Sequence, residues 1–521
     1  LQSNLRIEYD QTGNIDYKKQ EAAAQIDGIR RDIETNSDKL FKVQNLIKIW
    51  SDDLKDLENK TKNVINACAK IGAEAKVLFY DQKSAFMSSL PFYTMPFREN
   101  KRNVTVGGTS CLVPNGCTHL VHSEGKYIGR NIATRAPIIF DNYLCQKNWY
   151  KDSELYSNPN MYICGKPGSG KSSFMKIFMG RGILAGEWNV IFDMENEYRK
   201  ICQKFGGKYI YLKAGEKIGL NPLEVSISED EDGKKTIDIM DRVTDVVNLL
   251  NGFIEHYNKR SLNGTEIAEI QKAILRVYED RGINKSPKSL YDKNGKKKKM
   301  PILSDLKQAI YDVGCEVEER NKKISSSLIE ISETMEAITG NGLMNMFDCE
   351  TSGDISNFKE NKMVVFCLKY LDETSKFYAM TTILNWVWGF YSDWKYKGIQ
   401  KNVWIDEGWV LAKHKSSLSL IENFSRRGRK YWIGLIISTQ SITEFLNSKE
   451  GNAIVELCST KVLFKQSSSL AKKIGEQFGI PINVQKQMPN FVKGECIFVT
   501  ETGNAIIQVD MFGCEKEYSQ T

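Results

Sequence analysis

The feature that most constrains the fold is a glycine-rich loop between an apolar run and a helical pattern. The apolar run Met161–Cys164 has the length of a buried strand, and Phe174–Met179 has helical spacing. A strand, a GxxxxGK loop ending in Ser or Thr, and a helix, in that order, form the context of a phosphate-binding loop. The sequence therefore predicts that the chain binds a nucleoside triphosphate. The predicted binding residues are Gly165, Lys166, Pro167, Gly168, Ser169, Gly170, Lys171, Ser172 and Ser173.

The residue types of this loop indicate how it would hold phosphate. Glycines let backbone N–H groups close around phosphate oxygens, and the N-terminus of the following helix adds positive potential. Lys171 is predicted to reach the β- and γ-phosphates, and the Ser172 hydroxyl is predicted to ligate Mg²⁺. ATP and Mg²⁺ are the expected cofactors.

Composition adds only broad limits. The 521 residues are 41% hydrophobic and 26% charged, which is typical of a globular chain of roughly three domains. The net charge of +7 permits a polyanion or a membrane surface as a partner without requiring one. The 12 cysteines have no paired framework and are expected to be reduced in an intracellular protein. No apolar run is long enough for a transmembrane helix, and the non-methionine start at Leu1 suggests a truncated N-terminus.

Changes in residue pattern divide the chain into three parts. Residues 1–130 are expected to form a smaller α+β domain. In residues 131–225 and 358–521, buried strands alternate with helices, which predicts an ATPase domain with a mostly parallel sheet. Residues 226–357 have helical spacing and few strand signals, so we expect an all-α insertion within that domain.

The beginning of the first domain has two interpretations. Apolar residues recur at helical spacing from Ile26 to Ile71, which fits one long helix or a coiled-coil arm. The same stretch also fits a helix, a strand at 40–50, a helix at 53–71 and a strand at 74–80. The second interpretation is favoured because Ser51-Asp52-Asp53 is a helix start signal that would be misplaced within one long helix.

Three further features have both a functional and a plain structural interpretation, and the plain one is favoured for each. Residues 111–117 fit a hairpin, whereas a metal cluster would need zinc-site spacing that Cys111, Cys117, His119 and His122 lack. The run Gly295–Lys299, GKKKK, fits a solvated loop better than a nucleic-acid or lipid contact. The aromatic residues of Phe377–Trp394 fit core and subunit-interface packing better than base stacking.

A second apolar run supplies the other half of the predicted site. Val403–Ile405 is followed directly by two adjacent carboxylates, Asp406 and Glu407. At the carboxyl end of a strand, Asp406 can bind Mg²⁺ through water, and Glu407 can orient and deprotonate the attacking water. The pattern is weak in isolation, but it becomes strong in an α/β chain that also carries a phosphate-binding loop.

A third apolar run, Ile433–Thr439, ends in Gln440, which is predicted to sense the γ-phosphate or to position water. Arg426, Arg427 and Arg429 precede this strand. One of them could neutralise charge on the nucleotide of a neighbouring subunit, or they could form a solvated basic helix end. Arg429 is the best candidate for such an arginine finger because it lies directly before the strand.

With these motifs the chain resembles the large conjugation ATPase of type IV secretion systems, of the VirB-four or TrbE/TraE-like family in the HerA–FtsK superfamily. The resemblance is of the Gram-positive type and covers roughly residues 75–521. It rests on Ser88–Pro91, Gly165–Ser172, Asp193–Tyr198, Leu220–Pro222, Gly342–Asp354, Asp406–Trp409, Gly428–Lys430 and Thr439–Gln440.

The resemblance implies a RecA-like P-loop ATPase core with an inserted all-α subdomain, preceded by a smaller α+β N-terminal domain. It implies a cytoplasmic motor, peripheral at the inner face of the cell membrane, that hydrolyses ATP to drive channel or pilus assembly and DNA or protein transfer. The implied partners are other secretion channel and coupling proteins and further copies of the chain in a hexamer, with weak DNA contact. Two alternatives are a DNA-pumping translocase or coupling ATPase of the same superfamily, and a nucleotide-binding assembly scaffold with little hydrolysis.

Overall fold

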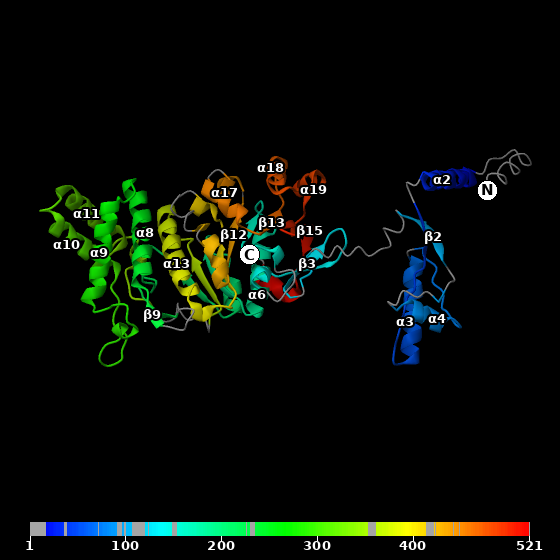
Figure 1. The fold of residues 1–521 in the computed structure, drawn as a ribbon, viewed down its shortest axis with the longest axis horizontal. Coiled ribbons are helices and arrows are strands. Elements are labelled where there is room, and N and C mark those ends of the chain that lie inside the picture. Colours follow the sequence, from blue (N-terminus) through cyan, green and yellow to red (C-terminus); the bar gives the residue numbers. More distant parts are fainter. Residues whose placement is uncertain are drawn as a thin grey trace, which may run out of the picture. The chain divides into compact units, whose positions relative to one another are not determined.

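The computed structural model of the chain forms two compact units, residues 1–116 and 117–521 (Figure 1). We had expected the first boundary at residue 130. It lies earlier because β3 (Lys126–Asn131) pairs with β15 (Gly503–Val509) in the large sheet of the second unit. The structure describes residues 17–35, 39–70, 72–90, 96–97, 101–106, 120–122, 124–147, 154–225, 227–229, 235–352, 361–412, 421–422, 424–440, 442–446 and 449–519.

The first unit confirms the interpretation in which helices and a strand alternate. Its helices are α2 (Tyr17–Glu34), α3 (Leu54–Lys70) and α4 (Gln82–Ser88). The expected strand at 40–50 is shorter, since β1 (Leu40–Val43) pairs antiparallel with β2 (Arg102–Thr105) and then ends. The strand expected at 74–80 is wrong: residues 73–80 contain no strand, and Tyr80 is 97% exposed. The expected hairpin at 111–117 lies outside the described residues.

The second unit is built on one sheet of 11 strands in the order β4-β3-β15-β14-β13-β5-β12-β11-β6-β10-β7. Strands β13 to β7 in this order are parallel, and the four pairs from β4 to β13 are antiparallel. This confirms the predicted α/β class. The strands not bounded above are β4 (Pro137–Phe140), β5 (Met161–Cys164), β6 (Trp188–Asp193), β7 (Lys208–Tyr211), β10 (Met363–Cys367), β11 (Lys401–Ile405), β12 (Ile433–Thr439), β13 (Thr460–Phe464) and β14 (Glu495–Thr500).

The central strands are apolar throughout because both faces of the sheet are covered. Along β5, Tyr162 and Cys164 join one hydrophobic cluster, while Met161 and Ile163 join the other. Parallel strands buried on both faces read as continuous apolar runs rather than as alternating ones. This is why the apolar runs of the sequence located β5, β11 and β12 so closely.

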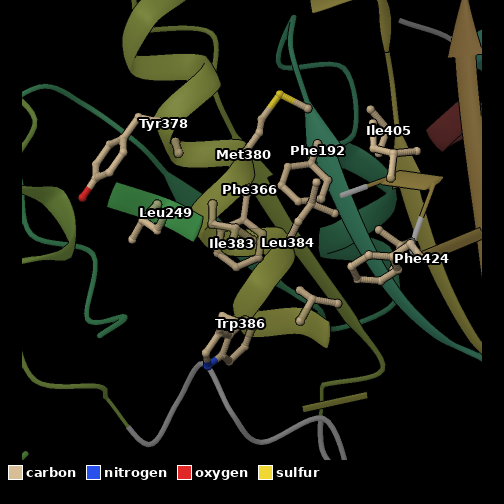
Figure 2. Close-up of a cluster of buried hydrophobic side chains, with 14 of the residues drawn as sticks. Phe192, Leu249, Phe366, Tyr378, Met380, Ile383, Leu384, Trp386, Ile405 and Phe424 are labelled. Carbon is tan, nitrogen blue, oxygen red and sulfur yellow. The ribbon is translucent and has the colours of Figure 1, made fainter. Parts of the chain in front are cut away.

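Helices cover the two faces of this sheet. On one face lie α6 (Lys171–Leu184) and α7 (Arg199–Lys204), through residues such as Phe178 and Ile201. On the other face lies α13 (Glu373–Tyr391), whose Met380, Ile383 and Leu384 pack with residues of β6 and β10 (Figure 2). The aromatic helix predicted at 377–394 is therefore a core element, which agrees with the packing interpretation.

The segment predicted as an insertion is mainly helical and gathers at one end of this unit (Figure 1). It contains α8 (Ile239–Asn258), α9 (Gly264–Asp280), α10 (Leu303–Val317) and α11 (Lys322–Thr334). It is not all-α as expected, because β8 (Ile227–Glu229) and β9 (Lys235–Ile237) form a short antiparallel pair. Within the residues that the structure describes, no helix has the length and hydropathy needed to cross a membrane.

The GKKKK run lies in a loop that is held by its own chain. The Lys297 ammonium pairs with Glu224, and the Lys298 ammonium donates to the backbone oxygens of Arg281 and Gly282, both at 3.0 Å. The structure therefore favours the loop interpretation over a nucleic-acid or lipid contact.

The last part of the chain contains elements for which the sequence analysis made no assignment. Besides β13, β14 and β15 these are α14 (Trp409–Ala412), α16 (Thr443–Leu446), α17 (Lys449–Glu456), α18 (Ser468–Phe478), α19 (Ile482–Gln487) and α20 (Lys516–Ser519).

Candidate nucleotide-binding and hydrolysis site

Three neighbouring strands bring the predicted site residues to one edge of the sheet. Strand β12 lies between β5, which leads into the glycine-rich loop, and β11, which leads into Asp406 and Glu407. All three strands are parallel, so their carboxyl ends meet at the same edge. The open edge at the carboxyl ends of parallel strands is where α/β proteins bind ligands.

The glycine-rich loop has a backbone that side chains would not permit. Gly168 and Gly170 have positive φ angles of 76° and 104°. A Cβ on Gly165 would lie 2.5 Å from Phe464 Cβ, and one on Gly170 would lie 2.9 Å from the Gly494 nitrogen. The Gly494 amide donates to the Ser169 oxygen at 3.0 Å, so the loop leading into β14 supports the loop that would cradle phosphate.

The loop lysine contacts both predicted carboxylates. Lys171 begins α6, and its ammonium nitrogen lies 2.9 Å from Glu407 Oε1 and 3.8 Å from Asp406 Oδ1. The Gln440 side-chain amide also donates to Glu407 Oε1, at 3.0 Å. Four of the predicted residues, from three different strand ends, therefore converge.

The backbone at Glu407 is strained, as is common at functional sites. Its φ angle is 50°, in the left-handed region that residues other than glycine seldom adopt. The conformation is stabilised by the Gly408 amide, which donates to the Ser438 oxygen at 2.8 Å. It leaves Glu407 Oε2 buried without a hydrogen-bond partner among the described residues. A carboxylate oxygen in this condition suits a general base, which must accept a proton from an added water.

Asp406 is held by residues that the sequence analysis did not assign. Ser438 Oγ donates to Asp406 Oδ1 at 2.6 Å, and the Glu407 amide donates to the same oxygen at 3.1 Å. The Tyr198 hydroxyl lies 3.2 Å from the other oxygen, Asp406 Oδ2. The signal for Ser438 was a hydroxyl residue near the end of an otherwise apolar strand. The signal for Tyr198 was its place in the acidic, aromatic segment after β6.

That segment, residues 193–198, is folded around Asp193, which is fully buried. One carboxylate oxygen accepts from the amides of Glu195 and Glu197, and the other accepts from the Tyr198 amide and the Tyr209 hydroxyl at 3.0 and 2.6 Å. Because these four donors occupy the carboxylate, Asp193 organises the turn. Burial and the nearby carboxylates raise the pKa of Tyr198 well above its usual value, so its hydroxyl stays protonated.

A second lysine of α6 faces the same segment. Lys176 is fully buried, and its ammonium nitrogen lies 3.7 Å from Glu197 Oε2. Burial lowers the pKa of Lys176, and the charges of Glu197, Asp193 and Asp406 oppose this shift.

The hydroxyl side chains after Lys171 lie on the first turn of α6. Both Ser172 and Ser173 are half-buried, and the Ser173 hydroxyl donates to the Ser519 oxygen at 3.3 Å. Mg²⁺ prefers hard oxygen ligands such as hydroxyl and carboxylate groups. Ser172 and Asp406 supply one of each at the edge where the glycine-rich loop opens, so the residues present fit this ion.

The structure does not bring Arg429 to the site of its own chain. Arg429 lies before β12, at the opposite, amino-terminal edge of the sheet. Its guanidinium donates to the backbone oxygens of Ser157 and Cys145 at 2.7 and 3.2 Å. Of the other two arginines, Arg426 pairs with Glu422 at 2.7 Å, and Arg427 lies over the Trp388 ring.

The candidate metal cluster receives no support. Among the described residues no group of His, Cys, Asp and Glu is arranged to hold a metal ion. His122 is engaged elsewhere, because its ring nitrogens lie 3.0 Å from the Tyr156 hydroxyl and 2.9 Å from the Asp141 amide nitrogen. Cys111, Cys117 and His119 lie outside the described residues.

Two family models match the second unit. Residues 132–312 match the TraG P-loop domain, and residues 373–512 match an AAA-like domain. Each model spans part of the chain, and together they include the glycine-rich loop, both site carboxylates and Gln440.

Individual relatives are distant in sequence. An uncharacterized protein of Bacillus anthracis is 23% identical over 91% of this chain and 78% of its own length. Protein TraC of Escherichia coli is also 23% identical, over 67% of this chain, and the chain covers 38% of TraC.

The fold has a solved counterpart. The structure of VirB4 of Thermoanaerobacter pseudethanolicus superposes with a TM-score of 0.60 and 21% identity, covering 77% of this chain and all of that one. This confirms the predicted RecA-like P-loop ATPase fold. Together with the two domain matches and the similarity to TraC, it supports the predicted resemblance of the chain to the VirB4/TraG-like conjugative ATPases.

Proposed function

We propose that this chain hydrolyses ATP and is the motor of a type IV secretion or conjugation machine, energising channel or pilus assembly and substrate transfer. The observation that carries the proposal is the convergence of Lys171, Glu407 and Gln440 beside the glycine-rich loop. A protein that bound nucleotide only as a scaffold would have no need of a strained, partly unpaired carboxylate at this position.

Each residue has a distinct part in the proposed reaction. Backbone amides of the loop and the Lys171 ammonium bind the phosphates, and Gln440 senses the γ-phosphate or helps to orient the attacking water. Glu407 Oε2 accepts the proton of that water. Asp406 and Ser172 would hold Mg²⁺, which neutralises charge on the β- and γ-phosphate oxygens when bound.

Arg429 enters the proposal only through oligomerisation. Because it lies at the opposite edge of the sheet, any contribution to hydrolysis would be made to the site of a neighbouring subunit. The proposed working form is a hexamer, since P-loop motors that share sites in this way act as rings.

The proposed partners are other channel and coupling proteins of the machine, with weak contact to DNA. The proposed location is the cytoplasm, peripheral at the inner face of the cell membrane. The resemblance to the VirB4/TraG-like ATPases supports both assignments, which concern the assembled machine rather than the site itself.

The test is the rate of ATP hydrolysis against protein concentration, with and without single- and double-stranded DNA, at low and moderate salt. An assembly-activated secretion motor is expected to show a rate per chain that rises with concentration and is insensitive to DNA. Glu407→Gln is the matched control, and it is expected to bind ATP while losing hydrolysis by about 100-fold or more.

Two results would contradict the proposal. Strong DNA stimulation that fades with salt would indicate a DNA-pumping translocase or coupling ATPase, because counterion release makes such binding salt-dependent. Secretion or transfer that continues in cells carrying only the Glu407→Gln variant would indicate an assembly scaffold in which hydrolysis matters little.

A further inference from the structure

The segment after β6, residues 193–198, has a consequence for the predicted metal ligand. Strand β6 is the direct neighbour of β11, with Phe192 beside Ile405 in the parallel register. The residues that follow these two, Asp193 and Asp406, therefore lie at adjacent strand ends. The Asp193 carboxylate is filled by three amides of its own segment and the Tyr209 hydroxyl of β7, whereas the Asp406 carboxylate is the one expected to meet Mg²⁺.

The turn around Asp193 brings the Tyr198 hydroxyl next to the Asp406 carboxylate. Tyr198 is fully buried, and its hydroxyl lies 3.2 Å from Asp406 Oδ2 and 3.6 Å from the Met175 sulfur of α6. The other carboxylate oxygen is held by Ser438 at 2.6 Å. Asp406 is thus fixed from both sides by hydroxyl groups of two neighbouring strand ends.

We propose that Tyr198 is a positioning residue that orients Asp406 toward Mg²⁺ and so sets the affinity of the loaded site for the ion. The inference rests on the proposed function, because it assumes a nucleotide with Mg²⁺ at this edge of the sheet. Hydrogen bonds to a carboxylate ligand fix its direction, and their loss typically lowers metal affinity about 10- to 100-fold. The donor to Asp406 is thus the last residue of the segment 193–198, whereas the first residue of that segment, Asp193, accepts the hydrogen bonds that hold the turn.

The chain offers a matched control in Tyr209. Its hydroxyl oxygen lies 2.6 Å from Asp193 Oδ2 and 2.8 Å from Asn196 Oδ1, and the hydrogen bonds of the described residues include none from Tyr209 to Asp406. Tyr198→Phe and Tyr209→Phe therefore each delete one hydroxyl group that contacts a carboxylate at this edge. Only the first removes a donor to the predicted metal ligand. Ser438→Ala is a positive comparator, because it removes the donor to the opposite oxygen of Asp406.

The experiment measures binding of a fluorescent, non-hydrolysable ATP analogue to the full chain, first in EDTA and then during a Mg²⁺ titration. Tyr198→Phe is expected to keep the wild-type affinity in EDTA and to raise the Mg²⁺ midpoint about 10-fold. Tyr209→Phe is expected to keep both values within about twofold, and Ser438→Ala is expected to raise the midpoint as Tyr198→Phe does. Thermal melting in EDTA shows whether each variant is folded.

An unchanged Mg²⁺ midpoint in Tyr198→Phe would overturn the inference, as would equal shifts in the Tyr198 and Tyr209 variants, which would mark a general effect on the turn. These results differ from a failure of the proposed function. If the wild type binds nucleotide with a normal Mg²⁺ response and Tyr198→Phe behaves identically, only the positioning role is lost. If the wild type binds no nucleotide, the proposed function fails and the positioning role falls with it.

Discussion

The two edges of the same parallel sheet differ in how their buried charged side chains are paired. At the carboxyl edge, two buried polar atoms of the candidate site have no hydrogen-bond partner among the described residues, Ser169 Oγ and Glu407 Oε2. The same edge contains the strained backbone of Glu407. Because most buried polar groups in proteins are paired, an unpaired carboxylate oxygen on a strained backbone marks a place at which chemistry is expected.

At the amino edge one cluster of buried charged and polar side chains is paired internally. Glu187 is 2% exposed, and its carboxylate pairs with the Lys126 ammonium and accepts from the Asn402 amide at 2.8 Å. The Lys126 ammonium also donates to Asn142 Oδ1 at 3.0 Å. The network joins β3, in the antiparallel part of the sheet, to β11 in the parallel part. Buried charge by itself therefore does not identify the site, whereas an unpaired carboxylate oxygen beside a phosphate-binding loop does.

The largest effect is expected at the carboxyl edge, from Lys171→Ala. Removing the ammonium should abolish measurable nucleotide binding, about 100-fold or more, because the phosphates lose their principal cation. The substitution also leaves the buried Asp406 and Glu407 carboxylates without their cation, so some unfolding free energy should be lost, and affinity is compared on protein that a urea transition shows to be folded. The measurement is nucleotide affinity by fluorescence titration, with Lys213→Ala, an exposed lysine paired with Glu216, as the control. Retained nucleotide binding would remove the main support for the site.

At the amino edge, Glu187→Ala is expected to lower stability without affecting nucleotide affinity. The substitution leaves the Lys126 ammonium buried without its anion, which typically costs about 3–5 kcal/mol of unfolding free energy. Nucleotide affinity of the folded protein should remain normal. The control is Glu517→Ala, which breaks an ion pair with Lys204 whose side chains are 70% and 52% exposed, and it should leave stability unchanged. If Glu187→Ala lost nucleotide binding but kept its stability, the amino edge would not be the structural edge that the comparison describes.

Lys401, the first residue of β11 at the amino edge, is expected to make the stability of the fold depend on pH. Its side chain is fully buried and donates to the Tyr396 oxygen at 2.7 Å, and burial lowers its pKa to about 7. Between that value and the unfolded pKa of about 10.4, the unfolded chain holds a proton that the folded chain lacks, so stability rises with pH.

Lys401→Met should remove this rise. Between pH 7 and pH 9 the wild type should gain about 2–3 kcal/mol relative to the variant, measured by urea unfolding at each pH. Lys213→Met should run parallel to the wild type, because that lysine is exposed in the folded chain. A wild-type curve parallel to that of Lys401→Met would show that the buried ammonium keeps its ordinary pKa.

The sequence predicted the parallel part of the sheet well because those strands are apolar on both faces. Recognisable motifs also follow the ends of several of them. It gave no assignment for β13, β14 and β15, and it placed β3 in the wrong domain. Antiparallel strands such as β15, with partly exposed residues, have a weaker signal. The pairing of β3 with β15 joins residues far apart in the chain, so no local sequence pattern predicts it. The strand expected at 74–80 failed because alternation alone does not supply a partner strand.

The candidate site was predictable where a residue's role follows from its local motif, as for Lys171, Asp406, Glu407 and Gln440. The supporting residues were not, because Tyr198 and Ser438 reach Asp406 only through the order of the strands. The division of the second unit into an ATPase domain and an insertion at 226–357 stays a proposal, since the structure treats residues 117–521 as one compact unit.

The smallest expected effect tests whether the amino edge is purely structural. Arg429→Ala removes two hydrogen bonds from a guanidinium to backbone oxygens, so unfolding free energy should fall by about 1 kcal/mol and nucleotide binding should remain. Mixing this variant with Glu407→Gln subunits then separates two roles. Hydrolysis rescued in the mixture would mean that Arg429 of one subunit completes the site of another, and the amino edge would then supply chemistry as well. Without rescue, Arg429 joins Glu187 and Lys401 as a residue that secures the strands whose opposite ends carry the site.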